Sequence, residues 1–155
     1  MSFWYRSIFV LFFTRGFLLA TWSSRGPAID DAIDLDLVSF GWYVACLSFG
    51  SIIGVLVSER QVEIMGSRNF LFLTSTWMGL ALVLLGLTLT NGEVVASYFL
   101  TFLLGVPLGM ADYDNNLEAT RINNLSAKNK VPVLHGAYSL GVFLGAGFVG
   151  LSIIF

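Results

Sequence analysis

The sequence has few charged residues and only one cysteine and one histidine. Eight basic and ten acidic side chains make up 12% of the 155 residues, against about 25% in soluble domains. Such sparse, clustered charges cannot supply the polar shell that a soluble domain of this length needs. The single Cys46 excludes an internal disulfide, and one cysteine with one histidine excludes the usual zinc spacings. We therefore expect no metal and no cofactor, and the absence of a basic, aromatic-interleaved patch argues against nucleic-acid binding.

Apolar residues make up 56% of the chain and gather in five runs. These runs cover approximately residues 7–24, 38–57, 70–90, 94–111 and 133–155, and we expect the fourth helix to extend toward residue 119. Each has roughly the 18–23 residues that cross a hydrocarbon core of about 30 Å as a helix. Because backbone groups at that depth have no water to bond, helix is the expected state. The sequence predicts an all-α membrane protein, a single transmembrane domain of five helices surrounded by the lipid bilayer.

The first run could instead be a cleaved secretory signal. Arg6 and the apolar residues that follow it have the general form of such a signal. However, Arg15 interrupts the apolar region, the residues before Trp22 make a poor cleavage site, and the rest of the chain is equally hydrophobic. We interpret this run as the first membrane span.

The connections between the runs differ in their charge. Residues 26–36 contain four aspartates, whereas residues 58–69 and 114–132 contain most of the bases. Only Arg25 falls on the acidic side, and six bases fall on the side of the N-terminus: Arg6, Arg60, Arg68, Arg121, Lys128 and Lys130. The positive-inside rule then predicts a multi-pass protein of the cell (inner or plasma) membrane with a cytoplasmic N-terminus.

Glycines recur four residues apart in three of the runs. The pairs are Gly50 with Gly54, Gly105 with Gly109, and Gly141 with Gly145. Small residues at this spacing allow membrane helices to approach closely. The three pairs predict helix–helix packing and carry no further functional meaning.

Two charged residues fall inside the predicted spans. Arg15 lies about 13 Å into the first span, and Asp112 lies about 10 Å from the same surface if the fourth helix continues to about Ala119. Charges at such depth are costly unless paired or hydrated. Arg15 could snorkel toward the headgroups, and Asp112 could be an interfacial carboxylate at a helix end. The functional hypothesis makes Asp112 a buried carboxylate that exchanges a proton during transport, with Arg15 or His135 controlling its protonation.

Two stretches carry motifs in a recognisable order. In residues 16–29, Trp22 and Arg25 lead into Pro27, which is similar to the end of the first helix in one group of permeases. Residues 58–68 are similar, without a gap, to the loop signature Gly-Arg-Leu-x-Asp-Arg-x-Gly-x-Arg of the major facilitator superfamily of secondary transporters. The matching positions are Arg60, Gly66 and Arg68, with Glu63 in place of the aspartate, whereas Glu59 and Ile64 depart from the signature.

A third stretch is the most specific. Residues 104–116 resemble a glycine-rich fourth helix in which Asn116 follows an acid, Asp112, by four residues. Residues 135–141 resemble the His-x-x-Phe-Ser-x-Gly opening of a fifth helix. In order and spacing, the three stretches resemble the fucose-permease-like branch of the superfamily and related uncharacterised bacterial permeases.

This resemblance implies a transporter of twelve helices in two halves that works by alternating access. It implies that Asp112 handles the proton and that Asn116 and His135 lie along the cytoplasmic part of the cavity. Arg15, which has no counterpart in the family, and Trp22 complete the candidate pathway. The resemblance also implies a gating loop that contains Arg60, Glu63, Gly66 and Arg68.

The chain contains only five of the helices that the resemblance implies. We therefore expect an incomplete N-terminal half of a proton-coupled permease for a small solute, such as a sugar or a drug-like compound, which needs a C-terminal half as its partner. The alternative is a small structural or scaffold membrane protein without transport activity. The sequence offers no paired carboxylates, His/Cys cluster or nucleophile–base arrangement, so we do not expect an enzyme.

Overall fold

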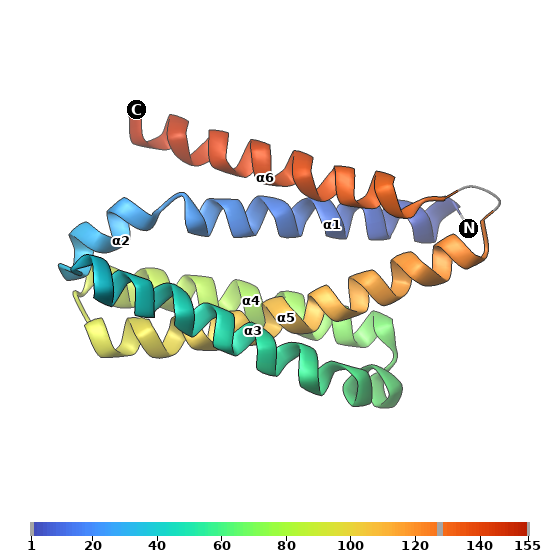
Figure 1. Ribbon diagram of the computed structural model, residues 1–155, viewed down its shortest axis with the longest axis horizontal. Helices are drawn as coiled ribbons and strands as arrows, with labels where there is room; N and C mark the ends of the chain where they lie inside the picture. Colours follow the sequence, from blue (N-terminus) through green and yellow to red (C-terminus); the bar gives the residue numbers. More distant parts are fainter. Residues whose placement is uncertain (1, 127–128, 155) are drawn as a thin grey trace. The chain divides into compact units, whose positions relative to one another are not determined.

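The computed structural model describes residues 2–126 and 129–154, and Figure 1 shows the helices that they form. In chain order these are α1 (Ser2–Ser23), α2 (Gly26–Ile33), α3 (Leu37–Met65), α4 (Ser67–Thr90), α5 (Val94–Asn124) and α6 (Val131–Ile154). No strand occurs within these ranges. All of the helices except the short α2 are long and apolar enough to cross a membrane, which confirms the predicted all-α class and the five transmembrane helices. Lys128 and Phe155, which the sequence analysis used, lie outside the described residues.

Two of the membrane helices extend well beyond their apolar runs. Helix α3 has 29 residues and α5 has 31, so they measure about 43 and 46 Å at about 1.5 Å per residue, more than the roughly 30 Å of a hydrocarbon core. Most of the connection predicted at residues 58–69 is therefore helical. Hydropathy marks only the part of a helix that lies in lipid, and charged residues continue the same helix beyond it.

The acidic connection at residues 26–36 is also partly helical, which corrects its interpretation as a loop. Helix α2 has Pro27 in its first turn, where the missing N–H costs no hydrogen bond. Asp36 caps α3, and its side chain accepts a hydrogen bond of 3.0 Å from the backbone N–H of Ser39. The bonds from Ser39 lower the pKa of the Asp36 carboxyl below its ordinary value. Pro27 and Asp36 of the acidic connection thus shape helix ends.

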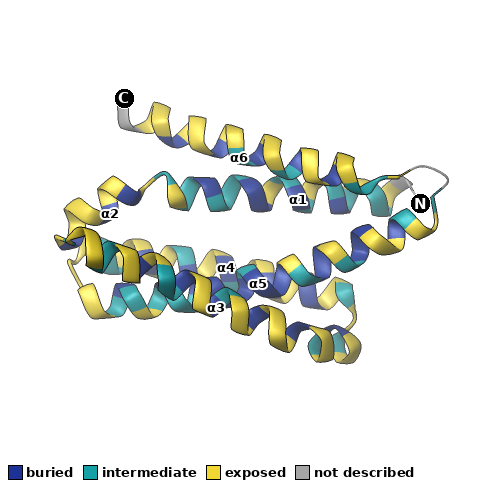
Figure 2. Ribbon diagram, viewed as in Figure 1, coloured by how far each residue is buried: buried dark blue, intermediate teal, exposed yellow. Residues whose placement is uncertain are grey.

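The chain forms two compact units. Unit 1 comprises residues 1–27 and 115–155, with α1, α6 and the end of α5, and unit 2 comprises residues 28–114, with α3, α4 and most of α5. Figure 2 shows exposed residues along the outer faces of α3, α4 and α6. Many of them are large and apolar, such as Phe49, Leu80 and Phe143. Extensive apolar exposure is expected of a surface that faces lipid.

Within unit 2, α3 and α5 approach each other through glycines on both helices. A Cβ atom at any of four positions would collide with a backbone carbonyl oxygen of the other helix. The oxygens are those of Phe102 and Val106 for Gly50 and Gly54, and those of Leu47 and Ser51 for Gly105 and Gly109. The predicted helix packing is confirmed, and the structure adds that these two glycine pairs face one another.

Within unit 1, α1 and α6 lie side by side (Figure 1) and meet through a different set of residues. A Cβ atom at Gly141 or Gly145 would collide with the carbonyl oxygen of Phe13 or Phe17 of α1. Conversely, a Cβ atom at Gly16 of α1 would collide with the Tyr138 carbonyl oxygen of α6. The Phe17 ring also contacts the ring of Phe148, with centroids 5.9 Å apart. The third glycine pair therefore packs against a helix with large side chains.

Candidate functional site

The polar residues of α5 divide between two faces of the helix. Asp112 and Asn116 are one turn apart, and both are exposed. Asp114, Asn115 and Glu118 are buried. At 3.6 residues per turn, residues 112 and 116 share one face and residues 115 and 118 another. Asp112 is therefore on the exposed face of α5 in this chain, and its role as a proton carrier stays a prediction.

The candidates on α1 are buried in the protein to different degrees. The Arg15 side chain is only 6% exposed. Trp22 is partly buried, and its indole Nε1 is buried without a hydrogen-bond partner among the described residues. The two residues are seven positions apart, or about 10 Å along the helix. Arg15 belongs to unit 1 and Asp112 to unit 2, so the predicted effect of Arg15 on Asp112 stays a prediction.

His135 lies in the second turn of α6 and is exposed. The edge of its ring packs against Phe12 of α1, with centroids 5.4 Å apart and planes at 80°. The Ser139 hydroxyl donates a hydrogen bond of 3.1 Å to the His135 carbonyl oxygen. Only the Phe12 contact positions the imidazole, and the predicted place of His135 in a transport pathway stays a prediction.

The predicted gating loop spans the junction of two helices. Arg60 and Glu63 lie in the last turns of α3, Arg68 lies in the first turn of α4, and all three are exposed. Gly66 ends α3 with φ 75°, and its N–H donates a hydrogen bond of 2.8 Å to the Val62 carbonyl oxygen. Side chains rarely tolerate this backbone conformation. The positive φ therefore explains why a glycine occupies this position, and the gating role of the loop stays a prediction.

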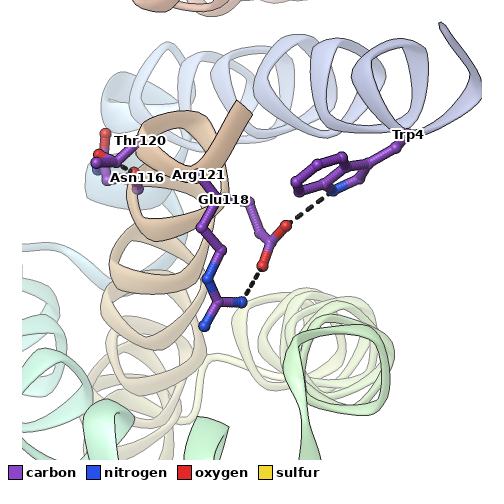
Figure 3. Close-up of polar contacts among 5 residues, drawn as sticks. All are labelled: Trp4, Asn116, Glu118, Thr120 and Arg121. Carbon is purple, nitrogen blue, oxygen red and sulfur yellow. Dashed lines mark hydrogen bonds and ion pairs between the residues drawn. The ribbon is translucent and has the colours of Figure 1, made fainter. Parts of the chain in front are cut away.

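A buried carboxylate that the sequence analysis did not single out lies near the end of α5. Glu118 is 5% exposed, and its Oε2 accepts a hydrogen bond of 2.8 Å from the Trp4 indole Nε1–H of α1. Its Oε1 accepts a hydrogen bond of 2.5 Å from the Arg121 guanidinium (Figure 3). The ion pair keeps the buried charge compensated. The Glu-x-x-Arg spacing, in a helix expected to continue toward residue 119, is the signal in the sequence that indicates this ion pair.

A second buried polar cluster lies between α3 and α5 in unit 2. Tyr43, Ser97 and Thr101 are fully buried, and the Tyr43 hydroxyl has the hydroxyls of Ser97 and Thr101 as neighbours without a hydrogen bond of regular geometry. The Tyr98 hydroxyl donates a hydrogen bond of 2.7 Å to the Ser39 carbonyl oxygen, and its ring packs edge-on against Tyr43. These hydroxyls sit next to the glycine contacts and help to fix the pairing of the two helices.

The described residues contain no group of three or more His, Cys, Asp or Glu side chains that could hold a metal ion. No family model matches the chain. No solved structure matches it either. The geometry and the sequence relatives are therefore the basis for a functional assignment.

Two curated proteins are similar to this chain. One is an uncharacterised MFS-type transporter of Yersinia pestis, 28% identical over 138 residues, which are 89% of this chain and 35% of that protein. The other is an uncharacterised transporter of Sinorhizobium fredii, 24% identical over 151 residues, which are 97% of this chain and 39% of that protein. The chain thus spans between 35% and 39% of the length of these relatives. With the five apolar helices, they support a multi-pass membrane protein similar to transporters at the level of the superfamily.

Proposed function

We propose that this chain is the N-terminal part of a secondary transporter of the major facilitator type, within or near the fucose-permease-like branch. The observation that carries the proposal is the likeness to two proteins named as transporters, which extends over 89% and 97% of this chain. Because the chain spans little more than a third of these relatives, a C-terminal half is the partner that we propose for it. The complete protein would work by alternating access about a site between its halves.

The exposed polar face of α5 supports a cavity at that place. Asp112, Asn116 and Thr120 follow one another at four-residue intervals, and all three are exposed. Asp112 directly follows the apolar run of α5, where an exposed polar side chain is costly in lipid, so this face favours a hydrated cavity over lipid. We assign Asp112 the proton-exchanging role, with a small polar or drug-like solute as the cargo.

The direct test begins with the DNA downstream of the coding region, where we expect a frame that encodes the remaining helices. The two parts, co-expressed and reconstituted into proteoliposomes, should accumulate a sugar probe (L-fucose) or a drug-like probe (ethidium) when a proton gradient is applied. Asp112→Asn should abolish accumulation, while Asp31→Asn in the exposed acidic connection is the matched control and should retain it.

Two results would contradict the proposal. Full proton-driven uptake by Asp112→Asn would exclude the proton role of this residue. A structural or scaffold protein would be favoured if no probe is taken up, Asp112→Ala folds as the wild type does, and no downstream frame exists.

The proposed orientation, with the N-terminus in the cytoplasm of a cell membrane, has its own test. Cys46 is the only cysteine, so a Cys46→Ala background accepts single reporter cysteines. In intact cells, an impermeant maleimide should label a cysteine at Asp31 and should not label one at Arg68. The opposite pattern would reverse the orientation.

A further inference from the structure

The two units differ sharply in charge. Unit 1 contains a single acid, Glu118, and six bases, which gives a formal charge of +5. Unit 2 contains nine acids and two bases, Arg60 and Arg68, which gives −7, and the two values together make the net charge of −2. Among the described residues, three of these bases belong to the start of α1, the last turns of α5 and the residue before α6: Arg6, Arg121 and Lys130. Such an excess attracts anions at that end of the unit.

The contacts in unit 1 bring these segments together. Trp4 of α1 and Arg121 of α5 both bind Glu118 (Figure 3), and the next residue of α1, Tyr5, lies under the Lys130 ammonium at 5.3 Å from its ring centroid. The Lys130 backbone N–H also donates a hydrogen bond of 3.0 Å to the Asn123 side-chain oxygen of α5. Arg121 and Lys130 are thereby held beside two consecutive residues of the first turn of α1.

Two of the cations at this end are exposed, Lys130 is half-buried, and the carboxylate is buried. The Arg121 side chain is 50% exposed, whereas that of Glu118 is 6% exposed. Arg6, which follows Tyr5, is also exposed. The surface formed by Tyr5, Arg6, Arg121 and Lys130, here called the basic end, therefore presents three cations beside aromatic rings.

We infer that the basic end binds the phosphate headgroup of an anionic phospholipid. Aromatic residues at the ends of membrane helices lie at headgroup level, and clustered Lys and Arg side chains attract anionic lipid there. Lys130 and Arg121 are already positioned by contacts within the protein, so less side-chain entropy is lost on binding. This inference needs only the membrane assignment, and it is independent of the proposed transport and of the orientation.

The test is a competition between two lipids for the purified chain in detergent. Equimolar phosphatidylglycerol and phosphatidylcholine are added, and native mass spectrometry counts the bound molecules of each. Wild type should prefer phosphatidylglycerol. Arg6→Gln/Lys130→Gln should reduce this preference by about fivefold for each base removed, since a base near a membrane surface contributes about 1 kcal/mol.

The matched control removes the same charge from the other unit. Arg60→Gln/Arg68→Gln takes away two exposed bases of unit 2 and should leave the preference unchanged. An equal loss in this control would show a general charge effect and overturn the inference, as would an unchanged preference in Arg6→Gln/Lys130→Gln. Neither variant alters Glu118 or its two hydrogen-bond partners, and circular dichroism verifies that both fold.

A final arm separates a lipid from a free anion. Inorganic phosphate is added in excess at constant ionic strength, and chloride at the same ionic strength is the control. Retention of phosphatidylglycerol by the wild type supports the lipid site. Displacement by phosphate, but not by chloride, would assign the basic end to a soluble phosphate and overturn the lipid assignment.

Discussion

The crossing of α3 with α5 and the crossing of α1 with α6 bury glycines in different ways. In the first, glycines occur on both helices, and a Cβ atom at Gly50 would lie 3.1 Å from the Gly105 Cα as well as against the Phe102 backbone. In the second, Gly141 and Gly145 of α6 meet the α1 backbone at Phe13 and Phe17, and α1 contributes a single glycine, Gly16, which meets the Tyr138 backbone. A Cβ atom at Gly145 would lie further from its nearest oxygen than one at any of the four glycines of the first crossing, and it would also meet the Ala20 side chain. The same four-residue spacing of glycines thus produces a closer backbone contact between α3 and α5 than between α1 and α6.

The polar contacts differ between the same two regions. The α3–α5 pair is accompanied by neutral hydroxyls, with the Tyr98 hydroxyl bound to the Ser39 carbonyl oxygen. Unit 1 instead joins α1 to α5 through the charged Glu118 and its ion pair with Arg121. A charge-assisted hydrogen bond is about twice as strong as a neutral one, but it leaves a costly buried charge when a partner is removed. We therefore expect the two units to respond differently to substitution.

The largest effect is expected at the α3–α5 crossing. Gly109→Ala should destabilise the protein by about 3 kcal/mol, because the new methyl group meets the Ser51 backbone, which cannot rotate away. Gly79→Ala on α4 is the control, since a Cβ atom there has no neighbour within 4 Å. Thermal unfolding in detergent measures both. Equal stability of the two variants would contradict the close approach of α3 and α5.

A smaller effect is expected at the α1–α6 crossing. Gly141→Ala should cost about 2 kcal/mol, because the second neighbour of the new methyl group, the Phe17 backbone nitrogen, would lie at 2.9 Å, against 2.7 Å for the Ser51 carbonyl carbon at Gly109. Gly147→Ala, which introduces no contact, should be neutral or slightly stabilising. If Gly141→Ala proved more damaging than Gly109→Ala in the same unfolding assay, the ranking of the two crossings would be reversed.

The third effect concerns the buried carboxylate of unit 1. Trp4→Phe removes the indole donor and should cost about 1.5 kcal/mol, the lower end for a hydrogen bond to a charged group. A double-mutant cycle with Glu118→Gln should show coupling of about 1 kcal/mol between the two side chains. Trp42→Phe, at a side chain that is 62% exposed, provides the control. Additive effects in the cycle would show that this hydrogen bond contributes nothing measurable.

The smallest effect is a pH dependence at the start of α3. The hydrogen bonds from Ser39 lower the pKa of Asp36 below 3.8, so its carboxylate stabilises the folded state above about pH 4. This contribution is lost as the pH falls through the lowered pKa of the folded protein. The melting temperature of wild type should therefore exceed that of Asp36→Ala by a small margin at neutral pH, and the margin should shrink in acid. A margin that grows in acid would contradict the cap.

The sequence predicted the number and the approximate positions of the membrane helices better than the environment of individual side chains. Long apolar runs revealed five membrane helices, because each must satisfy its backbone hydrogen bonds internally. The spacing of Gly50 with Gly54 and of Gly105 with Gly109 also indicated close packing, but it did not say which pairs meet. The helical extension of α3 was not predicted, and that of α5 was predicted only toward residue 119, since helices continue beyond the apolar region into charged residues.

The candidate site was harder to predict. Asp112 drew attention as an acid within an apolar span, yet it is exposed, while the more buried Glu118 was passed over. Burial along α5 depends on which neighbours pack against each face, and a single sequence does not contain that information. Gly66 was assigned to a gating motif, and only its positive φ showed that the backbone itself favours glycine there.

The sequence by itself determined the membrane class and the number of membrane helices, because lipid excludes any other state for long apolar runs. It also determined how the charged residues are distributed along the chain. Only the tertiary structure decided that Trp4 and Glu118, which are 114 positions apart, share a hydrogen bond. The same holds for the pairing of the glycines and for the exposed and buried faces of α5. These features depend on contacts between distant segments, and packing chooses among the many contacts that the pattern of residues allows.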